Sequence, residues 1–328
     1  MRTRINLNKD WQFHYGELHP GPHEIAKKAY SLGGLTASLP EEEQKRLSVS
    51  PGGSHFLRLI AQGDEERGLR NLCGTDLDST IDDTWRKIDL PHDWKVDLPY
   101  ENDAETLMSG SKPNGVAYYR KRFGIDRKLE GKKLILHFEG AMQMADVWFN
   151  GAYLGHENSG YTGFEFDVSG MVYFDDEGQN TLLVRTDTTH GSEGWWYEGA
   201  GIYRNVFLDA VPLVHFEEDD LYVYTKELHD NGALLGYEFS VKNDTGRDVS
   251  VSVCLDVAGI RRDFSVFLKK HSVERFEGEL ELSDASLWSP EHPHLYQAVL
   301  SMEEDKIVKS FGVRTFGYDR DGFILNGR

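Results

Sequence analysis

Carboxylates are the commonest groups in this chain that could do chemistry, but no motif arranges them for catalysis. The 328 residues include 55 Asp and Glu, and paired carboxyl groups can serve as acid, base or nucleophile. The sequence contains no nucleophile elbow, P-loop, His-Glu-x-x-His motif or glycine-rich dinucleotide turn. Motifs alone therefore assign no residue a catalytic role.

The weaker ligand signals have simpler explanations. Gly199 and Gly201 precede a strand pattern, so they lack the helix N-terminus that a phosphate site needs. His292 and His294 flank a proline, which favours a solvated turn over a metal site. The two cysteines, Cys73 and Cys254, are too far apart for a zinc motif or a disulfide framework. We expect no metal here.

The charge of the chain limits its partners. Lys and Arg number 36 against 55 Asp and Glu, which gives a net charge of −19. Such a chain repels a phosphate backbone, so nucleic-acid binding is excluded. The first residues contain no apolar run of signal-peptide length, and no stretch approaches the ~20 apolar residues of a membrane span. We expect a cytoplasmic protein whose partner is a neutral small molecule or another protein.

The elements that must position any site are strands. Short β-branched and aromatic runs are separated by Gly, Asn and Asp, which is typical of an all-β sandwich. In the first half of the chain they predict strands at 116–123, 133–139, 144–150, 163–168, 181–187 and 203–210. Asn150-Gly151 lies between two of these runs and predicts a tight hairpin turn. Trp148 and Phe149 are adjacent, so at least one of them should be buried.

One region differs from this pattern, and a second block repeats it. Residues 16–83 contain a helix start after Ser38 and two Gly-Gly breaks, which indicate an insertion in the first domain. From about residue 212 the alternation returns, and it predicts strands at 221–225, 234–242, 249–257, 264–268, 272–282, 296–302 and 307–316. Seven short strands in about a hundred residues are typical of an immunoglobulin-like sandwich.

Six motifs stand in register along the first block. They are 90–94 (LPHDW), 118–123 (YYRKRF), 145–151 (ADVWFNG), 155–156 (GH), 160–168 (GYTGFEFDV) and 196–206 (WYEGAGIYRNV). In this order the set resembles the sugar-binding domain of family 2 β-galactosidases. Residues 287–296 (LWSPEHPHLY) and 311–315 (FGVRT) are similar to the immunoglobulin-like domain of that family, and 322–327 (GFILNG) to the segment leading into its catalytic barrel.

The resemblance implies a particular domain organisation. We expect a galactose-binding-like jelly-roll sandwich over residues 1–211 with the insertion at about 16–83. An immunoglobulin-like sandwich over 212–316 and a lead-in over 317–328 would follow. In this family a (β/α)8 barrel carries both catalytic glutamates, and it would begin after Arg328. The resemblance therefore implies a parent enzyme that hydrolyses terminal β-D-galactosides with retention, and an inactive 328-residue chain.

The resemblance also supplies the site candidates. Asp187 matches the family aspartate that approaches the terminal sugar, although a strand-end Asp that caps a turn explains it equally well. His92 and Asp93 are weaker candidates. Trp195 and Trp196 could line the mouth of the pocket or pack against the barrel. Trp94 is more simply a packing anchor, and Arg204 a structural ion-pair or carbonyl contact.

Other interpretations stay open at this point. The resemblance names the β-galactoside and the chain's own barrel as partners, implies no cofactor in this part, and leaves homo-oligomers and a metal requirement of the parent undecided. β-Glucuronidases and β-mannosidases share the architecture. A free-standing carbohydrate-binding module would bind sugar by itself, whereas a purely structural β-sandwich would need no exposed apolar face for a barrel.

Overall fold

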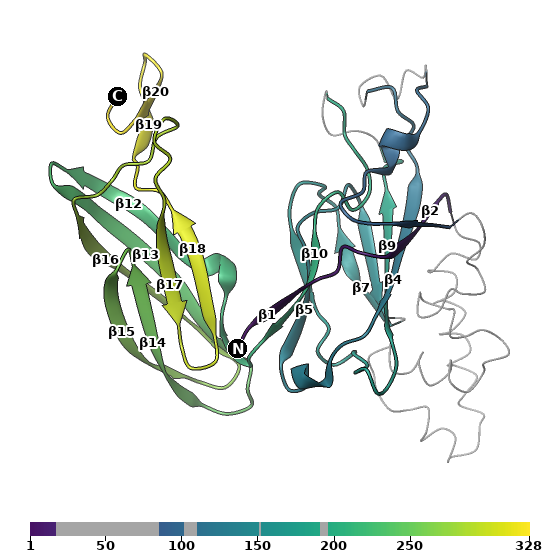
Figure 1. Cartoon of the computed structure of the whole chain (residues 1–328), viewed down its shortest axis with the longest axis horizontal. Helices are drawn as coiled ribbons and strands as arrows, with labels where there is room; N and C mark the ends of the chain where they lie inside the picture. The colour runs from purple at the N-terminus through teal and green to yellow at the C-terminus, as the bar shows by residue number, and fades with distance from the viewer. Residues whose placement is uncertain (18–84, 102–109, 151, 191–195) are drawn as a thin grey trace. The chain divides into compact units, whose positions relative to one another are not determined.

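The protein is all-β, as the sequence predicts. The computed structural model describes residues 1–17, 85–101, 110–150, 152–190 and 196–328, and these form two compact units (Figure 1). The first unit is Arg4–Ala210, and the second is Val211–Arg328 together with Met1–Thr3. The described helices are short 3-10 turns: η3 (Trp94–Asp97), η5 (Arg127–Leu129) and η6 (Glu218–Asp220). No helix among the described residues could cross a membrane.

The first unit contains a six-stranded and a four-stranded sheet. The larger sheet has the order β3-β2-β4-β9-β6-β7, with bounds Arg86–Ile88, Trp11–Tyr15, Val116–Phe123, Asn180–Asp187, Ala145–Phe149 and Ala152–Glu157. The smaller sheet has the order β1-β10-β5-β8, with bounds Thr3–Asn6, Val206–Val211, Lys133–Phe138 and Phe164–Asp167. Both sheets supply side chains to one hydrophobic core, which makes the unit a sandwich.

Alternation decides which side chains enter that core. Trp148 and Phe149 are neighbours on β6 and point to opposite faces of the sheet. Phe149 joins the main core, whereas Trp148 lies in a smaller buried cluster with Trp85 and Tyr118. Trp94 is also buried in the main core, so its predicted role as a packing anchor is confirmed.

The hairpin predicted at Asn150 is present. Phe149 pairs with Ala152 across β6 and β7, and Asn150 has a φ of 47°. Asparagine tolerates this left-handed conformation better than most residues. Its side chain is also anchored, because the amide donates to Asn180 Oδ1 and accepts from the Thr181 N–H. The turn thereby fixes the register of β6 against β7.

The second unit is a sandwich of two antiparallel sheets and a terminal hairpin. In one sheet β13 (Gly232–Asn243) pairs with β16 (Ser272–Ser283), β12 (Tyr222–His229) and β11 (Val214–Phe216). The other sheet has the order β15-β14-β17-β18, with bounds Ile260–Leu268, Val249–Val257, Tyr296–Ser301 and Lys306–Phe311. A separate core fills the space between them. The hairpin consists of β19 (Phe316–Tyr318) and β20 (Phe323–Leu325).

The predicted strand at 307–316 is wrong in its second half. β18 ends at Phe311, and β19 begins only at Phe316. The break has a local cause: Gly312 lies so close to Trp288 that an added Cβ would sit 2.9 Å from the Trp288 Cβ. Val313 then forms a parallel bridge with Leu287, so this segment leaves the antiparallel sheet.

The N-terminus also differs from the expected domain division. The sequence predicts a first domain over residues 1–211, but Met1–Thr3 belong to the second unit. The Arg2 guanidinium donates to both Asp305 oxygens at 3.0 Å and to the Phe216 carbonyl at 2.6 Å. The insertion predicted at 16–83 lies outside the described residues except for Gly16 and Glu17, and Cys73 and Trp195 lie outside them as well.

Candidate functional site

Several loops of the first unit meet around the Met142–Gln143 segment. The backbones of Met142 and Gly201 exchange two hydrogen bonds, and the Asp187 N–H donates to the Gln143 carbonyl at 3.0 Å. Gly160 lies directly against the Met142 side chain. Asp187 ends β9, while Gly160 and Gly201 belong to separate connections. This segment therefore brings three distant parts of the sequence to one end of the sandwich, which we call the loop end.

Asp93 connects the segment before η3 to the loop that carries Gly201. Its Oδ1 accepts from the Lys95 and Ala200 backbone N–H groups, at 3.0 and 2.9 Å. Its Oδ2 accepts from the Tyr197 hydroxyl at 2.9 Å. The first contact caps η3, since the Asp93 side chain satisfies a free N–H at the start of that turn. Asp93, a sugar-contact candidate in the sequence, thus has both carboxylate oxygens engaged by protein donors.

Both ring nitrogens of His92 likewise contact other side chains of the first unit. Its Nδ1 lies 2.8 Å from the Tyr119 hydroxyl, and its Nε2 lies 3.3 Å from an Arg86 guanidinium nitrogen. Burial, and then the positive charge of Arg86, lower the pKa of His92 below its usual value of 6.5. A neutral imidazole suits this position, because a second positive charge beside Arg86 would be unfavourable. The structure thus gives His92 a role in holding its loop.

Asp187 caps a turn. Its Oδ1 accepts from the Thr189 N–H at 2.8 Å and the Thr189 hydroxyl at 2.6 Å, and its Oδ2 accepts from Arg185 at 2.9 Å. Burial raises the pKa of the carboxyl, but the Thr189 and Arg185 contacts outweigh burial and leave the pKa below 3.8. Asp187 is therefore ionised at neutral pH. His190 Nε2 lies 3.7 Å from the same Oδ2, and Asp187 is only 4% exposed. A carboxylate oxygen has room for about two donors, so Oδ2 has capacity for one close hydrogen bond besides that from Arg185.

Trp196 is an exposed aromatic of the loop end, with 61% of its surface accessible, against 47% for Tyr161 and 41% for Tyr197. Its indole N–H donates to the Tyr161 hydroxyl at 3.2 Å. The Tyr161 hydroxyl in turn donates to Glu198 Oε1 at 3.4 Å. Trp195, the other predicted aromatic candidate, lies outside the described residues.

A buried lysine supplies positive charge beneath these loops. Lys95 is almost fully buried, and its ammonium donates to Asn114 Oδ1 at 2.8 Å. Burial lowers the pKa of Lys95 below its usual value of 10.5, while the Asp93 and Glu198 carboxylates act in the opposite direction. The loop end thus places a lysine within the field of two carboxylates, an arrangement that reduces the cost of burying each charge.

Two glycines allow the loops to approach this closely. A Cβ on Gly199 would collide with the Asp93 carboxylate, and one on Gly201 would collide with the Tyr119 hydroxyl. Gly201 also has a φ of +101°, which L-residues with a side chain rarely adopt. The close neighbours that require glycine at these two positions are therefore Asp93 and Tyr119.

Some contributors to the loop end were missed from sequence. The sequence offered no reason to select Tyr161, Glu198, Lys95 or Asn114, although the motifs at 160–168 and 196–206 contain the first two. Their pairing leaves no local pattern, because Tyr161 and Glu198 are 37 positions apart. Arg204, by contrast, makes the predicted carbonyl contact, at 3.4 Å from the Glu139 oxygen. Among the described residues, no group of three or more His, Cys, Asp or Glu could hold a metal ion.

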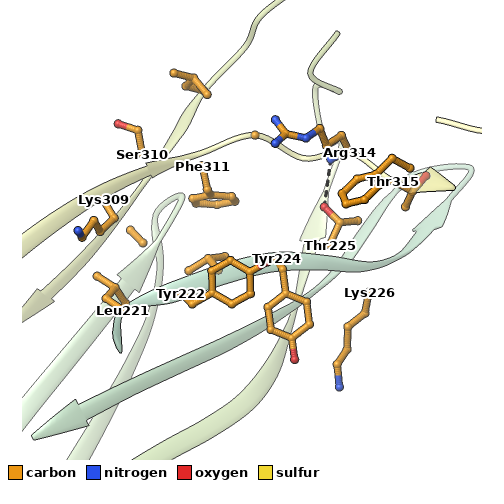
Figure 2. Close-up of a pocket in the computed structure, with 15 residues that line it drawn as sticks. Leu221, Tyr222, Tyr224, Thr225, Lys226, Lys309, Ser310, Phe311, Arg314 and Thr315 are labelled. Atoms are coloured by element: carbon orange, nitrogen blue, oxygen red, sulfur yellow. Dashed lines mark hydrogen bonds between the residues drawn. The ribbon is translucent and has the colours of Figure 1, made fainter. Parts of the chain in front are cut away.

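The second unit has a groove of its own, which sequence reasoning did not identify. It has a volume of about 730 Å³ and lies between β12 and the end of β18. Figure 2 shows the Tyr222, Tyr224 and Phe311 rings in this groove and the 3.1 Å hydrogen bond from the Arg314 N–H to Thr225 Oγ1. The two tyrosine rings stack with their centroids 5.1 Å apart.

The positive charges around this groove are already engaged. Lys226 pairs with Glu279 at 2.6 Å, and Lys309 lies 3.7 Å from Glu218. The Arg314 guanidinium lies over the Trp288 ring, 4.5 Å from its centroid. These contacts leave the groove without a distinct charge for a ligand, so we assign none to it.

Comparison with known families explains both units. Residues 77–212 match the model described as "Glycosyl hydrolases family 2, sugar binding domain", and residues 214–314 match "Glycosyl hydrolases family 2". The chain belongs to glycoside hydrolase family 2. The first match covers the first unit from residue 77 onward and the second covers most of the second unit, so the two sandwiches are the sugar-binding and immunoglobulin-like domains of this family.

The relatives are named for different activities. The β-galactosidase BoGH2A of Bacteroides ovatus is 34% identical over 263 residues, which are 75% of this chain and 30% of that protein. A putative β-glucuronidase of Formosa agariphila is 28% identical over 253 residues, 75% of this chain and 24% of the relative. A solved family 2 member from Bacteroides cellulosilyticus aligns with a TM-score of 0.72 and 25% identity, over 99% of this chain and 37% of its own. The chain therefore spans between 24% and 37% of the length of these relatives.

Proposed function

We propose that this chain is the non-catalytic front part of a retaining family 2 β-galactosidase, where it forms one wall of the pocket for a terminal β-D-galactoside. The observation that carries the proposal is the loop end itself, where an ionised Asp187 and the exposed indole of Trp196 belong to loops gathered around Met142–Gln143. Carbohydrate recognition needs this combination of a charged acceptor for hydroxyls and an aromatic surface for the apolar face of the ring.

The roles of the individual residues follow from their contacts. Asp187 Oδ2 accepts a sugar hydroxyl in addition to Arg185. Asp93 and His92 hold the surrounding loops in place through Tyr197 and Tyr119. The two carboxyl groups of retaining hydrolysis, about 5–5.5 Å apart, are proposed to lie in a part of the longer protein outside residues 1–328. The galactoside is favoured because the relative with 34% identity carries the name β-galactosidase.

β-Glucuronidase is the second candidate activity. Relatives with this name cover as much of the chain as BoGH2A does, at lower identity. A glucuronide differs from a galactoside in its C6 carboxylate and in its equatorial 4-hydroxyl, and that carboxylate would be repelled by the ionised Asp187 if it bound beside it. Like charges at short distance disfavour each other, so the described wall suits the neutral sugar better.

Saturation-transfer NMR on the purified chain tests the proposal, because it detects the weak binding expected of one pocket wall. We expect transfer to methyl β-D-galactoside and much less to methyl β-D-glucuronide. Asp187→Asn should weaken galactoside binding by about tenfold, the equivalent of one charge-assisted hydrogen bond. Asp209→Asn is the matched control: Asp209 also pairs with an arginine, Arg4, at 2.7 Å, but on the strand β10.

A hydrolysis assay tests the non-catalytic assignment. The purified chain should show no turnover of an aryl β-galactoside. Turnover that disappears when a residue within 1–328 is substituted would contradict this assignment, and preferential transfer to the glucuronide would favour the second activity.

A further inference from the structure

We propose that Tyr161 and Glu198 are positioning residues that hold the Trp196 indole as a stacking platform for the apolar face of a galacto-configured pyranoside. The inference rests on the proposed function and deepens it, since it assigns the fixed aromatic surface of the sugar wall. The arrangement is a chain of hydrogen bonds from the Trp196 Nε1–H to the Tyr161 hydroxyl and from that hydroxyl to Glu198 Oε1.

The chemistry of the three groups determines which of them donates and which accepts in these hydrogen bonds. An indole N–H is only a donor, and an ionised carboxylate is only an acceptor. The Tyr161 hydroxyl can therefore accept from Trp196 and donate to Glu198 at the same time, so the two hydrogen bonds are compatible. A carboxylate is a stronger acceptor than a neutral group at the same distance. At 3.4 Å the bond from Tyr161 is long, so it orients the ring through its direction more than through its strength.

The Glu198 carboxylate, which ends this series of hydrogen bonds, is held in place by its burial. Glu198 is only 4% exposed, whereas Trp196 two residues earlier is 61% exposed. A buried carboxylate needs compensation, and the buried Lys95 ammonium interacts favourably with it. A surface tryptophan that merely covers its neighbours would not require a buried acceptor beneath it. The cost of that burial indicates that the orientation of the indole has a use.

The two loops that carry the rings are anchored separately. The Tyr203 hydroxyl donates to the Gly160 carbonyl at 2.6 Å, which fixes the residue before Tyr161. On the other side Tyr197 and Ala200 are held by Asp93, which fixes the residues after Trp196. Because both backbones are held, the bond between the two side chains orients the indole relative to the loop end. A preorganised aromatic loses little conformational entropy when a ligand binds.

The kind of sugar that would bind follows from the properties of the Trp196 indole face. An aromatic face attracts C–H groups, because its π-face carries partial negative charge. A pyranose with an axial 4-hydroxyl gathers the hydrogens of carbons 3, 4 and 5 on one side, so its opposite face is more polar. A flat and oriented indole therefore discriminates for the galacto configuration, while Asp187 accepts from a hydroxyl.

Fluorine NMR of the chain labelled with fluorotryptophan tests the inference directly. The chain has 7 tryptophans, and the resonance missing from Trp196→Phe identifies Trp196. Addition of methyl β-D-galactoside should shift this resonance. Tyr161→Phe should move the resonance of the free protein and weaken the sugar affinity by about threefold or more, which is the value of a typical hydrogen bond.

Tyr153→Phe is the matched control. It also removes a tyrosine hydroxyl that donates to a carboxylate, here Asp146 at 2.8 Å, and should leave the Trp196 resonance and the affinity unchanged. If Tyr161→Phe does not fold, Glu198→Gln provides the same comparison, because it removes the charged acceptor and should also shift the resonance and weaken binding.

The outcomes separate this inference from the proposed function. If galactoside transfer is observed but Trp196→Ala binds equally well, or if Tyr161→Phe leaves affinity and resonance unchanged, the positioning inference is wrong and the proposed function stands. If no sugar gives any transfer to the chain, both are overturned. A Trp196 shift that Tyr161→Phe weakens and Tyr153→Phe does not would support both.

Discussion

The Tyr197 hydroxyl donates to Asp93 across 104 positions of sequence, at 2.9 Å. This contact joins the loop before η3 to the loop before β10. Burial, and then the hydrogen bond to Asp93, raise the pKa of Tyr197 above its usual value, so the hydroxyl remains a donor throughout the physiological range. The carboxylate at the centre of this contact should therefore be a major stabilising group of the first unit.

Asp93→Asn should lower the free energy of unfolding of the first unit by about 2 kcal/mol, because charge-assisted hydrogen bonds weaken together. Tyr197→Phe should cost about 1 kcal/mol. Urea unfolding of both single variants and the double variant measures this. The double variant should lose less than the sum of the two single losses, since the residues share one bond. Strict additivity would show that the observed contact contributes nothing.

Gly201→Ala should be among the most damaging single substitutions in the first unit. The added Cβ would collide with the Tyr119 hydroxyl, and the φ of +101° disfavours any side chain. We expect a loss of about 3 kcal/mol or more in the free energy of unfolding. Gly170→Ala is the matched control, because nothing lies within 4 Å of the Cβ that it adds. Equal melting temperatures for the two variants would contradict the prediction.

His92 and His137 should titrate on opposite sides of 6.5. Burial and Arg86 lower the pKa of His92, whereas the hydrogen bond with Glu165 raises that of His137. For His92, the unfolded chain binds more protons between the lowered pKa and 6.5, so stability rises with pH through that window. The stability from His137 is fully present below 6.5 and is lost as pH rises through its raised pKa.

NMR titration of the two imidazole rings in the folded protein measures these pKa values directly. Glu165→Gln is the control for His137, since it removes the carboxylate that lies 2.6 Å from the ring. The His137 pKa should fall in this variant, and the His92 pKa should not change. A His92 pKa at or above 6.5 in the wild-type protein would show that the ring is not held as described.

The strands could be predicted from sequence where alternation is uninterrupted. β4 and β14 have the predicted bounds, 116–123 and 249–257, because β-branched or aromatic residues recur from the first to the last residue of each. β12 continues past the predicted end at residue 225 to His229. A register shift between Thr225 and Glu227 breaks the period of two, so the pattern ends where the strand does not.

The loop end could be predicted only in part. The motifs around Asp93, Tyr161 and Trp196 all carried a signal, since each belongs to a segment that resembles the family. The roles of these residues depend on contacts between segments 35 to 107 positions apart. Spacing along the chain holds no record of such contacts. For the same reason, sequence reasoning identified Asp93 as a sugar-contact candidate, whereas its carboxylate proves to be engaged by three protein donors.

Arg2 should stabilise the second unit although it lies at the start of the chain. It pairs with Asp305, whose side chain is fully buried and also accepts from the Phe216 N–H at 2.9 Å. Arg2→Ala would leave this buried carboxylate without its counter-charge, so the second unit should lose about 3 kcal/mol of stability.

Arg4→Ala is the matched control: its partner Asp209 belongs to the first unit, and the Arg4 side chain is 39% exposed. Hydrogen exchange at the amides of β13 in both variants measures the effect. Faster exchange in Arg2→Ala alone is expected, because β13 is the central strand of the sheet that Arg2 supports through Phe216. Unchanged exchange in both variants would mean that the first three residues do not contribute to the second unit, and the domain boundary would then lie near residue 211 alone.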